Sequence, residues 1–271
     1  MPVALFVLTC LSTWYAGGMA YAVALMTILV FHECGHFMQA VRYRVPASFP
    51  FFLPLPISQI GTLGAFIRMD GDIPNKKVLF DIGISGPLAG LIPTSICCIW
   101  GISQSKLVPR EMIAGQIEFA HPLLFQWIQN WIFGPIPPDL TLILHPVAFA
   151  GWVGLLITAL NLVPLSQLDG GHIFYAIAGK QARRWTNAIF ILLIVLVIAF
   201  WLWHWVLMLL LIRWIGIDHP PTGNDAIPID LPRKILGWLT LAFLIIGFTP
   251  QPIVLESLEP LQTIPRVVVM R

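Results

Sequence analysis

Two histidines and a glutamate lie within one helical turn of each other, in the segment His32-Glu33-Cys34-Gly35-His36. Side chains four positions apart on an α-helix share a face and differ by about 6 Å in height. His32 and His36 could therefore bind one metal ion, and Glu33 could take a proton from a water molecule at that ion. The alternative is a buried histidine pair that hydrogen-bonds to neighbouring polar groups, which is costly in an apolar segment. The spacing favours a metal site with an adjacent general base.

A later cluster of polar and helix-breaking residues contains a candidate third ligand, Asp169. A catalytic zinc ion usually has three protein ligands, so two imidazoles leave the site one short. Pro164 removes a backbone hydrogen bond, and Gly170 and Gly171 relax the chain, so we expect the helix to open here. On its own, Asp169 could instead cap the helix that follows. Together with the two histidines, it is interpreted as the third metal ligand.

Two further polar residues flank Asp169. Asn161 precedes it by two helical turns, and its amide could hydrogen-bond a substrate backbone or a developing oxyanion. A hydrogen bond to a neighbouring helix explains Asn161 equally well. His172 directly follows the Asp-Gly-Gly turn and is interpreted as an interfacial residue, with a role as a metal ligand as the alternative.

The elements that must position these side chains are strongly apolar. Of the 271 residues, 58% are hydrophobic and 10% are charged, whereas soluble domains are roughly 45–50% apolar and about 25% charged. The net charge is only +2, too small for a surface that neutralises nucleic-acid phosphates. The composition therefore excludes a soluble enzyme, a disordered protein and a nucleic-acid-binding protein. It predicts an all-α polytopic membrane protein embedded in a lipid bilayer.

Apolar runs that can cross about 30 Å of hydrocarbon predict about six transmembrane helices. They lie near residues 2–15, 19–41, 81–101, 145–166, 187–212 and 235–249. The fifth run could also break near residues 201–205 into two shorter helices. We expect the spans to form a single integral-membrane domain over residues 1–271.

Lys and Arg residues between these spans are unevenly distributed. Ten fall on the face that carries the span ends with His36 and Asp169, and five fall on the other face. Because cytoplasmic loops carry the excess of Lys and Arg, we expect the candidate site to lie toward the cytoplasmic side or its organellar equivalent. On the opposite face, Leu123, Trp127 and Trp131 predict an interfacial amphipathic helix.

The segment between the second and third spans, residues 46–74, contains five prolines, which exclude a long helix. The β-branched and aromatic run after Gly61 predicts a small membrane-associated strand. The unpaired edge of such a strand could accept an extended peptide by strand addition. A proline-rich surface loop is the alternative. The candidate substrate-binding residues in this strand are Gly61, Thr62, Leu63, Gly64, Ala65 and Phe66.

In combination, these motifs resemble the site-2 protease family of intramembrane zinc metalloproteases, peptidase family M50. The resemblance is carried by His32-Glu33-x-x-His36 and by Asn161-x-x-Pro164-x-x-x-Leu168-Asp169-Gly170. Residues 54–57, 61–68, 80–90 and 219–222 are similar to the compact branch of that family, which bacteria and plastids share and which has no PDZ insertion.

The resemblance implies a zinc-dependent endopeptidase with one zinc ion per chain. It implies that His32, His36 and Asp169 hold the zinc and that Glu33 is the catalytic base. It also implies a substrate that is a transmembrane helix of another protein, unwound at the scissile bond. The expected location is a bacterial inner membrane or a plastid membrane, and the oligomeric state is left open.

Two other functions were weighed against the protease. Some zinc permeases carry a similar histidine-glutamate motif, but a transport pathway needs further ligands, and residues 81–101 offer no His, Glu or Asp beyond Asp81. A catalytically silent membrane protein that binds clients is the other alternative, and nothing in the sequence favours it. Metal-dependent cleavage of a transmembrane reporter separates the protease from both.

Overall fold

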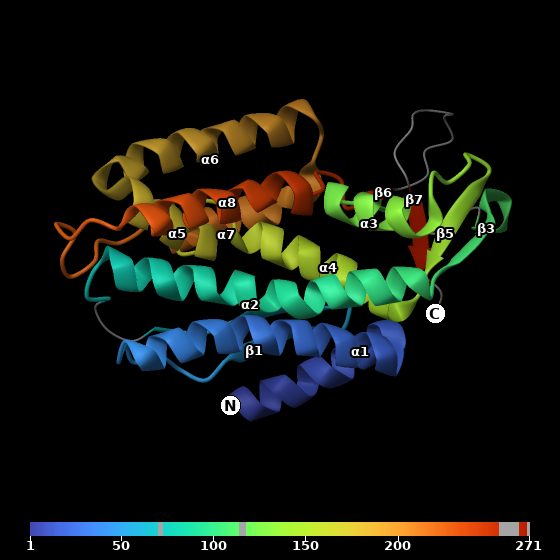
Figure 1. Ribbon diagram of the computed structural model, residues 1–271, viewed down its shortest axis with the longest axis horizontal. Coiled ribbons are helices and arrows are strands. Elements are labelled where there is room, and N and C mark those ends of the chain that lie inside the picture. Colours follow the sequence, from blue (N-terminus) through green and yellow to red (C-terminus); the bar gives the residue numbers. More distant parts are fainter. Residues whose placement is uncertain (70–72, 114–117, 255–265, 270–271) are drawn as a thin grey trace.

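The first helix folds back on itself. In the computed structural model, which describes residues 1–69, 73–113, 118–254 and 266–269, α1 extends over Pro2–Arg42 and includes both of the first two predicted spans. At Gly18 the backbone leaves the helical region, with φ at 80°, a conformation that glycine adopts at little steric cost. Figure 1 shows the N-terminal arm of α1 turning back beneath the rest of the helix.

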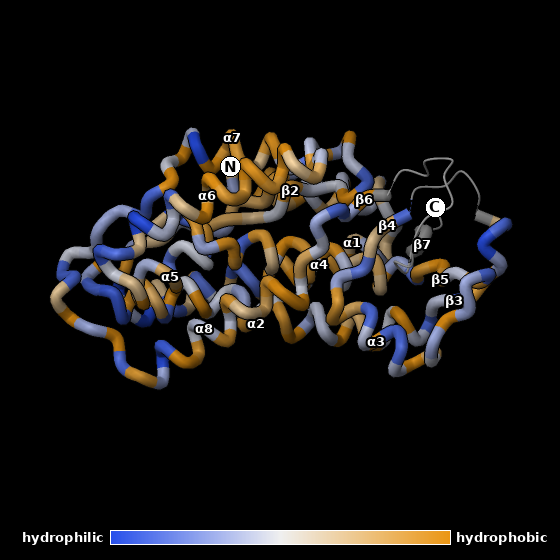
Figure 2. Tube along the Cα trace, turned by 90° about the horizontal axis from the view of Figure 1, so that it is seen from above, coloured by the Kyte–Doolittle hydropathy of each residue, from blue (hydrophilic) through white to orange (hydrophobic). Residues whose placement is uncertain are grey.

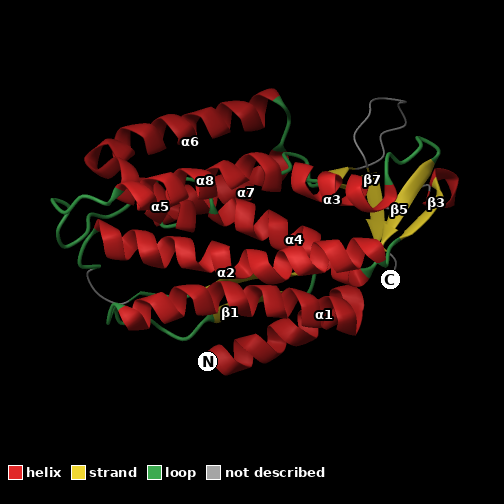
Figure 3. Cartoon of the chain, in the orientation of Figure 1, coloured by secondary structure: helices red, strands yellow, loops and turns green. Residues whose placement is uncertain are grey.

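The remaining helices are packed roughly side by side along the length of the molecule (Figures 1 and 3). Helix α2 (Lys76–Ser103) packs against α1, α4 and α5, so it contacts both of the helices, α1 and α5, that carry candidate ligands. The helices after α1 are α2 (Lys76–Ser103), α3 (Leu123–Phe133), α4 (Pro146–Asn161), α5 (Asp169–Ala178), α6 (Ala182–Ala199), α7 (Val206–Ile215) and α8 (Leu231–Gly247). Short 3₁₀ turns cover Arg110–Ile113, Gly179–Gln181 and Trp203–Trp205. A mostly helical fold is therefore confirmed.

The predicted count of six transmembrane spans is not confirmed. By length and composition, three helical segments of the described chain can cross a membrane, namely Pro2–Arg42, Lys76–Ser103 and Asp169–Ala199. Helix α4 has only 16 residues, since the chain opens after Asn161. The fifth predicted span is broken between α6 and α7, where Trp201 has a φ of 53°. Hydrophobic residues follow the helices, and hydrophilic residues are more frequent toward the two ends of the long axis (Figure 2).

The segment after α1 forms a two-stranded antiparallel sheet from β1 (Phe51–Leu55) and β2 (Gly61–Phe66). Both arms of α1 form hydrogen bonds to the turn between β1 and β2. The Ser12 hydroxyl donates a 2.6 Å hydrogen bond to the carbonyl of Gly61, and the Tyr21 hydroxyl donates a 2.7 Å bond to the carbonyl of Ile60. The hairpin is thereby fixed against the helix that carries the two histidines.

A second sheet, not predicted from the sequence, lies at the other end of the molecule from α5 (Figure 1). Its strand order is β3-β5-β7-β4-β6. The strands are β3 (Lys106–Pro109), β4 (Glu118–Ala120), β5 (Leu140–Leu144), β6 (Ile253–Val254) and β7 (Arg266–Val269). Next to this sheet lies α3, at the position where the sequence predicts an amphipathic helix.

Candidate metal centre

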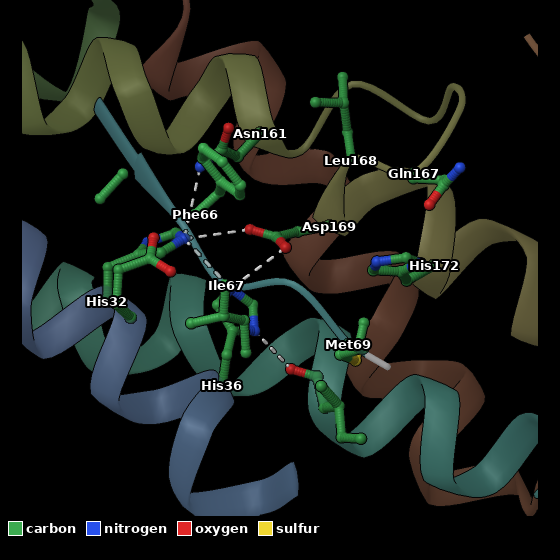
Figure 4. Close-up of a pocket in the computed structure, with 13 residues that line it drawn as sticks. His32, His36, Phe66, Ile67, Met69, Asn161, Gln167, Leu168, Asp169 and His172 are labelled. Carbon is green, nitrogen blue, oxygen red and sulfur yellow. Dashed lines mark hydrogen bonds and ion pairs between the residues drawn. The ribbon is translucent and has the colours of Figure 1, made fainter. Parts of the chain in front are cut away.

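Three candidate ligands from distant parts of the chain converge at one point. His32 and His36 project from α1, and Asp169 is the first residue of α5. The two oxygens of Asp169 each lie 3.1 Å from an imidazole Nε2, Oδ2 from that of His32 and Oδ1 from that of His36 (Figure 4). One ligand atom from each side chain lies within 4.8 Å of the others. The structure thus brings together the three residues proposed from the sequence.

The donor set fits a zinc ion. Two imidazole nitrogens and a carboxylate oxygen are zinc ligands, and the two Nε2 atoms lie 3.3 Å apart. On the other side of its ring, Nδ1 of His36 donates a 2.8 Å hydrogen bond to the carbonyl of Ile82. That bond leaves Nε2 as the nitrogen with a free lone pair and fixes the orientation of the ring, as is usual for metal-binding histidines.

Glu33 lies beside these ligands and is almost fully buried, with 2% of its surface exposed. Its Oε2 atom has no hydrogen-bond partner within the described part of the chain. A buried carboxylate oxygen without a partner is costly, so the arrangement requires a donor from outside the protein. Glu33 lines the same pocket as the three ligands, where a water molecule can supply that donor.

The wall behind the ligands is made by glycines of α2. A Cβ atom at Gly86 would lie 2.0 Å from Nε2 of His36, and one at Gly90 would lie 3.1 Å from His32. At Gly83 a Cβ would lie 2.7 Å from Cβ of His172. The spacing of these glycines puts them on one face of α2. The three histidines therefore pack against α2 at positions where a larger residue would clash or be tightly crowded.

The change Gly86→Ala is therefore expected to lower the zinc content of the purified protein to well below one ion per chain. Alanine in a helix interior is normally favoured over glycine by roughly 0.5–1 kcal/mol. Helix propensity alone would therefore stabilise the variant, and a loss of zinc would have to come from the steric clash. Metal analysis by mass spectrometry measures it. The matched control, Gly90→Ala, makes a looser contact and should lose less zinc; equal zinc in both variants and wild type would contradict the steric argument.

The chain between α4 and α5 is irregular and places Asp169. Ser166 has a φ of 55°, a left-handed conformation that is unusual for a residue with a side chain. A Cβ on Gly170 would lie 2.1 Å from the carbonyl oxygen of Leu162, and one on Gly171 would lie 2.3 Å from that of Ser166. The first turn of α5 can pack this closely on the loop only because both positions are glycine.

Asn161, the last residue of α4, also reaches the centre. Its Nδ2 atom lies 3.4 Å from Nε2 of His32 (Figure 4). Asn161 also lines the pocket. The amide is thus next to the ligands, where either a bound peptide or the neighbouring helix could receive its hydrogen bond.

The pocket over this centre is lined in part by the C-terminal end of β2 and the residues that follow it. Its lining residues are His32, Glu33, His36, Ala65, Phe66, Ile67, Met69, Ile82, Asn161, Gln167, Leu168, Asp169 and His172 (Figure 4). Of the six strand residues proposed to bind substrate, the structure places only Ala65 and Phe66 at the pocket.

The other four strand residues lie away from the pocket. The Thr62 hydroxyl donates a 2.8 Å hydrogen bond to the carbonyl of Leu53 in β1, Gly61 packs against the N-terminal arm of α1, and Gly64 has a φ of +100°. Leu63 is 63% exposed. The contacts and backbone geometry of Gly61, Thr62 and Gly64 show that these residues stabilise the hairpin.

His172 is the main residue whose position the sequence did not predict. Its interpretation as an interfacial residue did not predict that it is buried, with 7% of its surface exposed, and that it lines the pocket. One signal could have placed it there. It follows Asp169 by three positions in a helix, and side chains at that spacing share a face.

Comparison with known proteins identifies similar sequences. The sequence model of peptidase family M50 matches residues 20–203. A probable zinc metalloprotease, EGY1, chloroplastic, from Oryza sativa subsp. japonica is 34% identical over 171 residues, 59% of this chain and 28% of the relative. EGY1 from Arabidopsis thaliana is 33% identical over 168 residues, 60% of this chain and 30% of the relative. EGY2 from the same plant is 33% identical over 174 residues, 63% of this chain and 31% of the relative. The matched regions span less than a third of each relative.

Proposed function

The chain belongs to peptidase family M50, and on that basis we propose that it is a zinc-dependent intramembrane endopeptidase. Its substrate is the transmembrane segment of another membrane protein, cut in or near that segment. The observation that carries the proposal is the convergence of His32, His36 and Asp169 beside a buried Glu33, within helices apolar enough to lie in a bilayer.

Each residue of the centre has a separate role in the proposed reaction. His32, His36 and Asp169 hold the zinc ion, which supplies Lewis acidity that polarises a peptide carbonyl and lowers the pKa of water. Glu33 accepts a proton from the attacking water and delivers it to the nitrogen of the leaving amine as the carbon–nitrogen bond breaks. The Asn161 amide donates a hydrogen bond to the substrate carbonyl oxygen as negative charge develops there.

The substrate binds in an extended conformation beside β2. A helical peptide bond is covered by its own side chains, so the segment must unwind before Glu33 and the ligands can reach it. Unwinding exposes backbone groups that need partners in a membrane. Strand addition at β2 supplies them. Two observations support this placement: Ala65 and Phe66 line the pocket, and β2 pairs only with β1 among the described strands.

The change Ala65→Pro is expected to lower kcat/KM by at least tenfold and leave zinc content unchanged. Proline removes a backbone donor and disturbs strand pairing, while the metal ligands lie on other elements. Cleavage kinetics and metal analysis on the same preparation measure the two effects. The matched control is Leu63→Ala, whose side chain is exposed on the same strand. Parallel loss of zinc and activity in Ala65→Pro would mean that the strand is scaffolding for the centre.

We place the protein in a plastid membrane or a bacterial inner membrane. The names of the plant relatives describe them as chloroplastic, which supports a plastid. The candidate site is proposed to lie on the side whose loops are richer in Lys and Arg.

A reconstituted cleavage assay tests the proposed function. The purified chain is placed in liposomes with a single-span reporter protein whose transmembrane segment contains an Asn-Gly pair that weakens its helix. We expect cleavage within that segment, loss of cleavage after chelation, and recovery when zinc is restored. Zinc uptake into the liposomes without cleavage would identify a transporter instead. Reporter binding with neither cleavage nor bound metal would identify a client-binding protein.

A further inference from the structure

A second pair of histidines lies next to the metal centre. His172 on α5 and His219, in the loop between α7 and α8, are joined by a 2.7 Å contact between Nδ1 of His172 and Nε2 of His219. Their ring centroids are 4.8 Å apart, with the planes nearly perpendicular. The mechanism above uses neither residue, although His172 lines the same pocket as Glu33.

The hydrogen bonds of this pair determine which nitrogens carry protons. Nδ1 of His219 lies 2.6 Å from the carbonyl oxygen of Pro220, which can only accept, so this nitrogen is protonated. Burial lowers the pKa of His219 below its usual value, so the ring is neutral near pH 7 and its Nε2 is an acceptor. Nδ1 of His172 must therefore be the donor in the contact between the two rings.

His172 is left with an unprotonated Nε2. The ring is buried, where a charged imidazolium is costly, so it holds one proton, on the Nδ1 that donates to His219. Nε2 has no hydrogen-bond partner among the described residues. Figure 4 shows the ring pointing from α5 toward Asp169 and the pocket. The described cluster that could hold a metal consists of His32, His36 and Asp169 without His172, so this lone pair is available to another ligand.

Several contacts hold His219 in place. The Tyr175 ring stacks on it at 4.7 Å, and the Tyr175 hydroxyl donates a 2.6 Å hydrogen bond to Asp225. The Asp225 carboxylate also accepts from the Thr222 hydroxyl at 2.7 Å. Close by, the backbone nitrogen of Ser166 donates to the carbonyl of Ile217 at 2.9 Å. The loop that carries His219 is therefore attached both to α5 and to the irregular segment that places Asp169.

An extended peptide that pairs with β2 would need hydrogen-bond acceptors on its other edge. Backbone N–H groups of a strand point alternately to its two edges, so pairing with β2 satisfies only one edge. Ala65, Phe66 and His172 all line this pocket, with His172 contributed by a different element from the strand. At membrane depth an unpaired N–H is costly, and the free Nε2 is an acceptor available to it.

We propose that His172 contacts the substrate, its Nε2 accepting a hydrogen bond from a backbone N–H of the unwound peptide on the edge opposite β2. His219 is a positioning residue that keeps this nitrogen unprotonated by accepting the proton of Nδ1. The proposal rests on the protease function proposed above and assigns the other edge of its substrate site. It also gives a role to the His219-Pro-Pro-Thr222 segment, which the catalytic mechanism leaves unused.

The kinetic test uses the single-span reporter. His172→Phe keeps a planar aromatic ring without an acceptor, and we expect KM to rise about tenfold, the scale of one net hydrogen bond, with kcat within about twofold. His172→Gln retains an acceptor and should recover most of the loss. His219→Leu should raise KM in the same direction, and His219→Gln should restore it, because its amide oxygen can accept from Nδ1 of His172. Zinc should stay at one ion per chain in all four variants.

The matched control is His204→Phe, which changes an exposed histidine bound to the carbonyl of Pro250 and should leave KM unchanged. An unchanged KM in His172→Phe would overturn the proposal. Zinc loss in that variant would also overturn it, because His172 would then be part of the metal site.

A spectroscopic test does not depend on cleavage. Nitrogen-15 NMR of the histidine-labelled protein, assigned with the His172→Gln variant, reports which ring nitrogens are protonated. We expect both His172 and His219 to carry the proton on Nδ1, and His219→Leu to change the tautomer of His172. A proton on Nε2 of His172 in the wild type would overturn the inference whatever the reporter does. Conversely, the expected tautomer in a protein that never cleaves the reporter would overturn the protease function alone.

Discussion

Glu33→Gln is expected to abolish cleavage of the reporter while zinc remains bound. Glutamine has nearly the same shape as glutamate but cannot accept a proton from water, and loss of a general base typically costs about 10²–10⁴ in rate. Glu33 is not one of the clustered ligands, so the change leaves their donor atoms in place. Both expectations are checked on one preparation, the loss of cleavage by turnover of the reporter and the retention of the metal by zinc content per chain.

The local structure around Glu33 makes this variant easy to interpret. The side chain is buried at 2% exposure, and its Oε2 has no partner in the described chain, so an amide group of the same size breaks no observed hydrogen bond of that atom. Glu33→Asp is the matched control, because it keeps the carboxylate but withdraws it by one methylene. It should retain measurable activity. Turnover of Glu33→Gln within tenfold of wild type would eliminate the proposed role of Glu33.

The second large effect is expected for Asp169→Ala, which should lose its zinc and, with it, all cleavage. Asp169 supplies the only proposed ligand outside α1, and its two oxygens lie 3.1 Å from the ligand nitrogens of both histidines. Without it, two imidazoles remain from one helical turn, fewer than the three protein ligands of a typical catalytic zinc site. Zinc analysis of the purified variant is the direct measurement.

Unfolding is a trivial explanation that this experiment must exclude. Asp169 is the acidic residue in the first turn of α5. Its interaction with the helix dipole stabilises such a helix by about 0.3–1 kcal/mol. The carboxylate also contacts both imidazoles at 3.1 Å, so circular dichroism must show unchanged helix content before the loss of zinc is assigned to the missing ligand. Asp169→Asn is the matched control, since it keeps the shape and should retain more zinc than alanine. One zinc per chain in Asp169→Ala would refute the three-ligand site.

The parts of the site that could be predicted from sequence are those governed by local geometry. His32 and His36 share a helical face because of their spacing alone. Asp169 lies 137 residues from His32, and it was identified because zinc requires a third ligand and the surrounding residues interrupt a helix. His172 was missed because its place in the pocket depends on the close packing of α5 against Gly83, a tertiary contact that no local pattern reports.

The fold shows the same division between local and distant determinants. The apolar composition and the prolines of residues 46–74 correctly indicated a mostly helical protein with a small β segment. The count of six spans is not confirmed, because an apolar run does not reveal where a helix opens, as α4 does after Asn161. The five-stranded sheet was not predicted, because its strands are short and β5 pairs with the distant β7, so its stability comes from contacts between remote segments.

The glycine wall of α2 limits how this centre can vary. A Cβ at Gly83 or Gly86 would clash, and one at Gly90 would make a tight 3.1 Å contact with His32. Helix α2 therefore presents mainly backbone to the metal centre, with Ile82 as its one side chain among the described residues that line the pocket. We expect changes in peptide selectivity to arise mainly from the other walls, namely the end of β2 with the residues that follow it, and the segment that contains Gln167 and Leu168. Libraries for redesigning selectivity should therefore diversify those two segments and leave α2 unchanged.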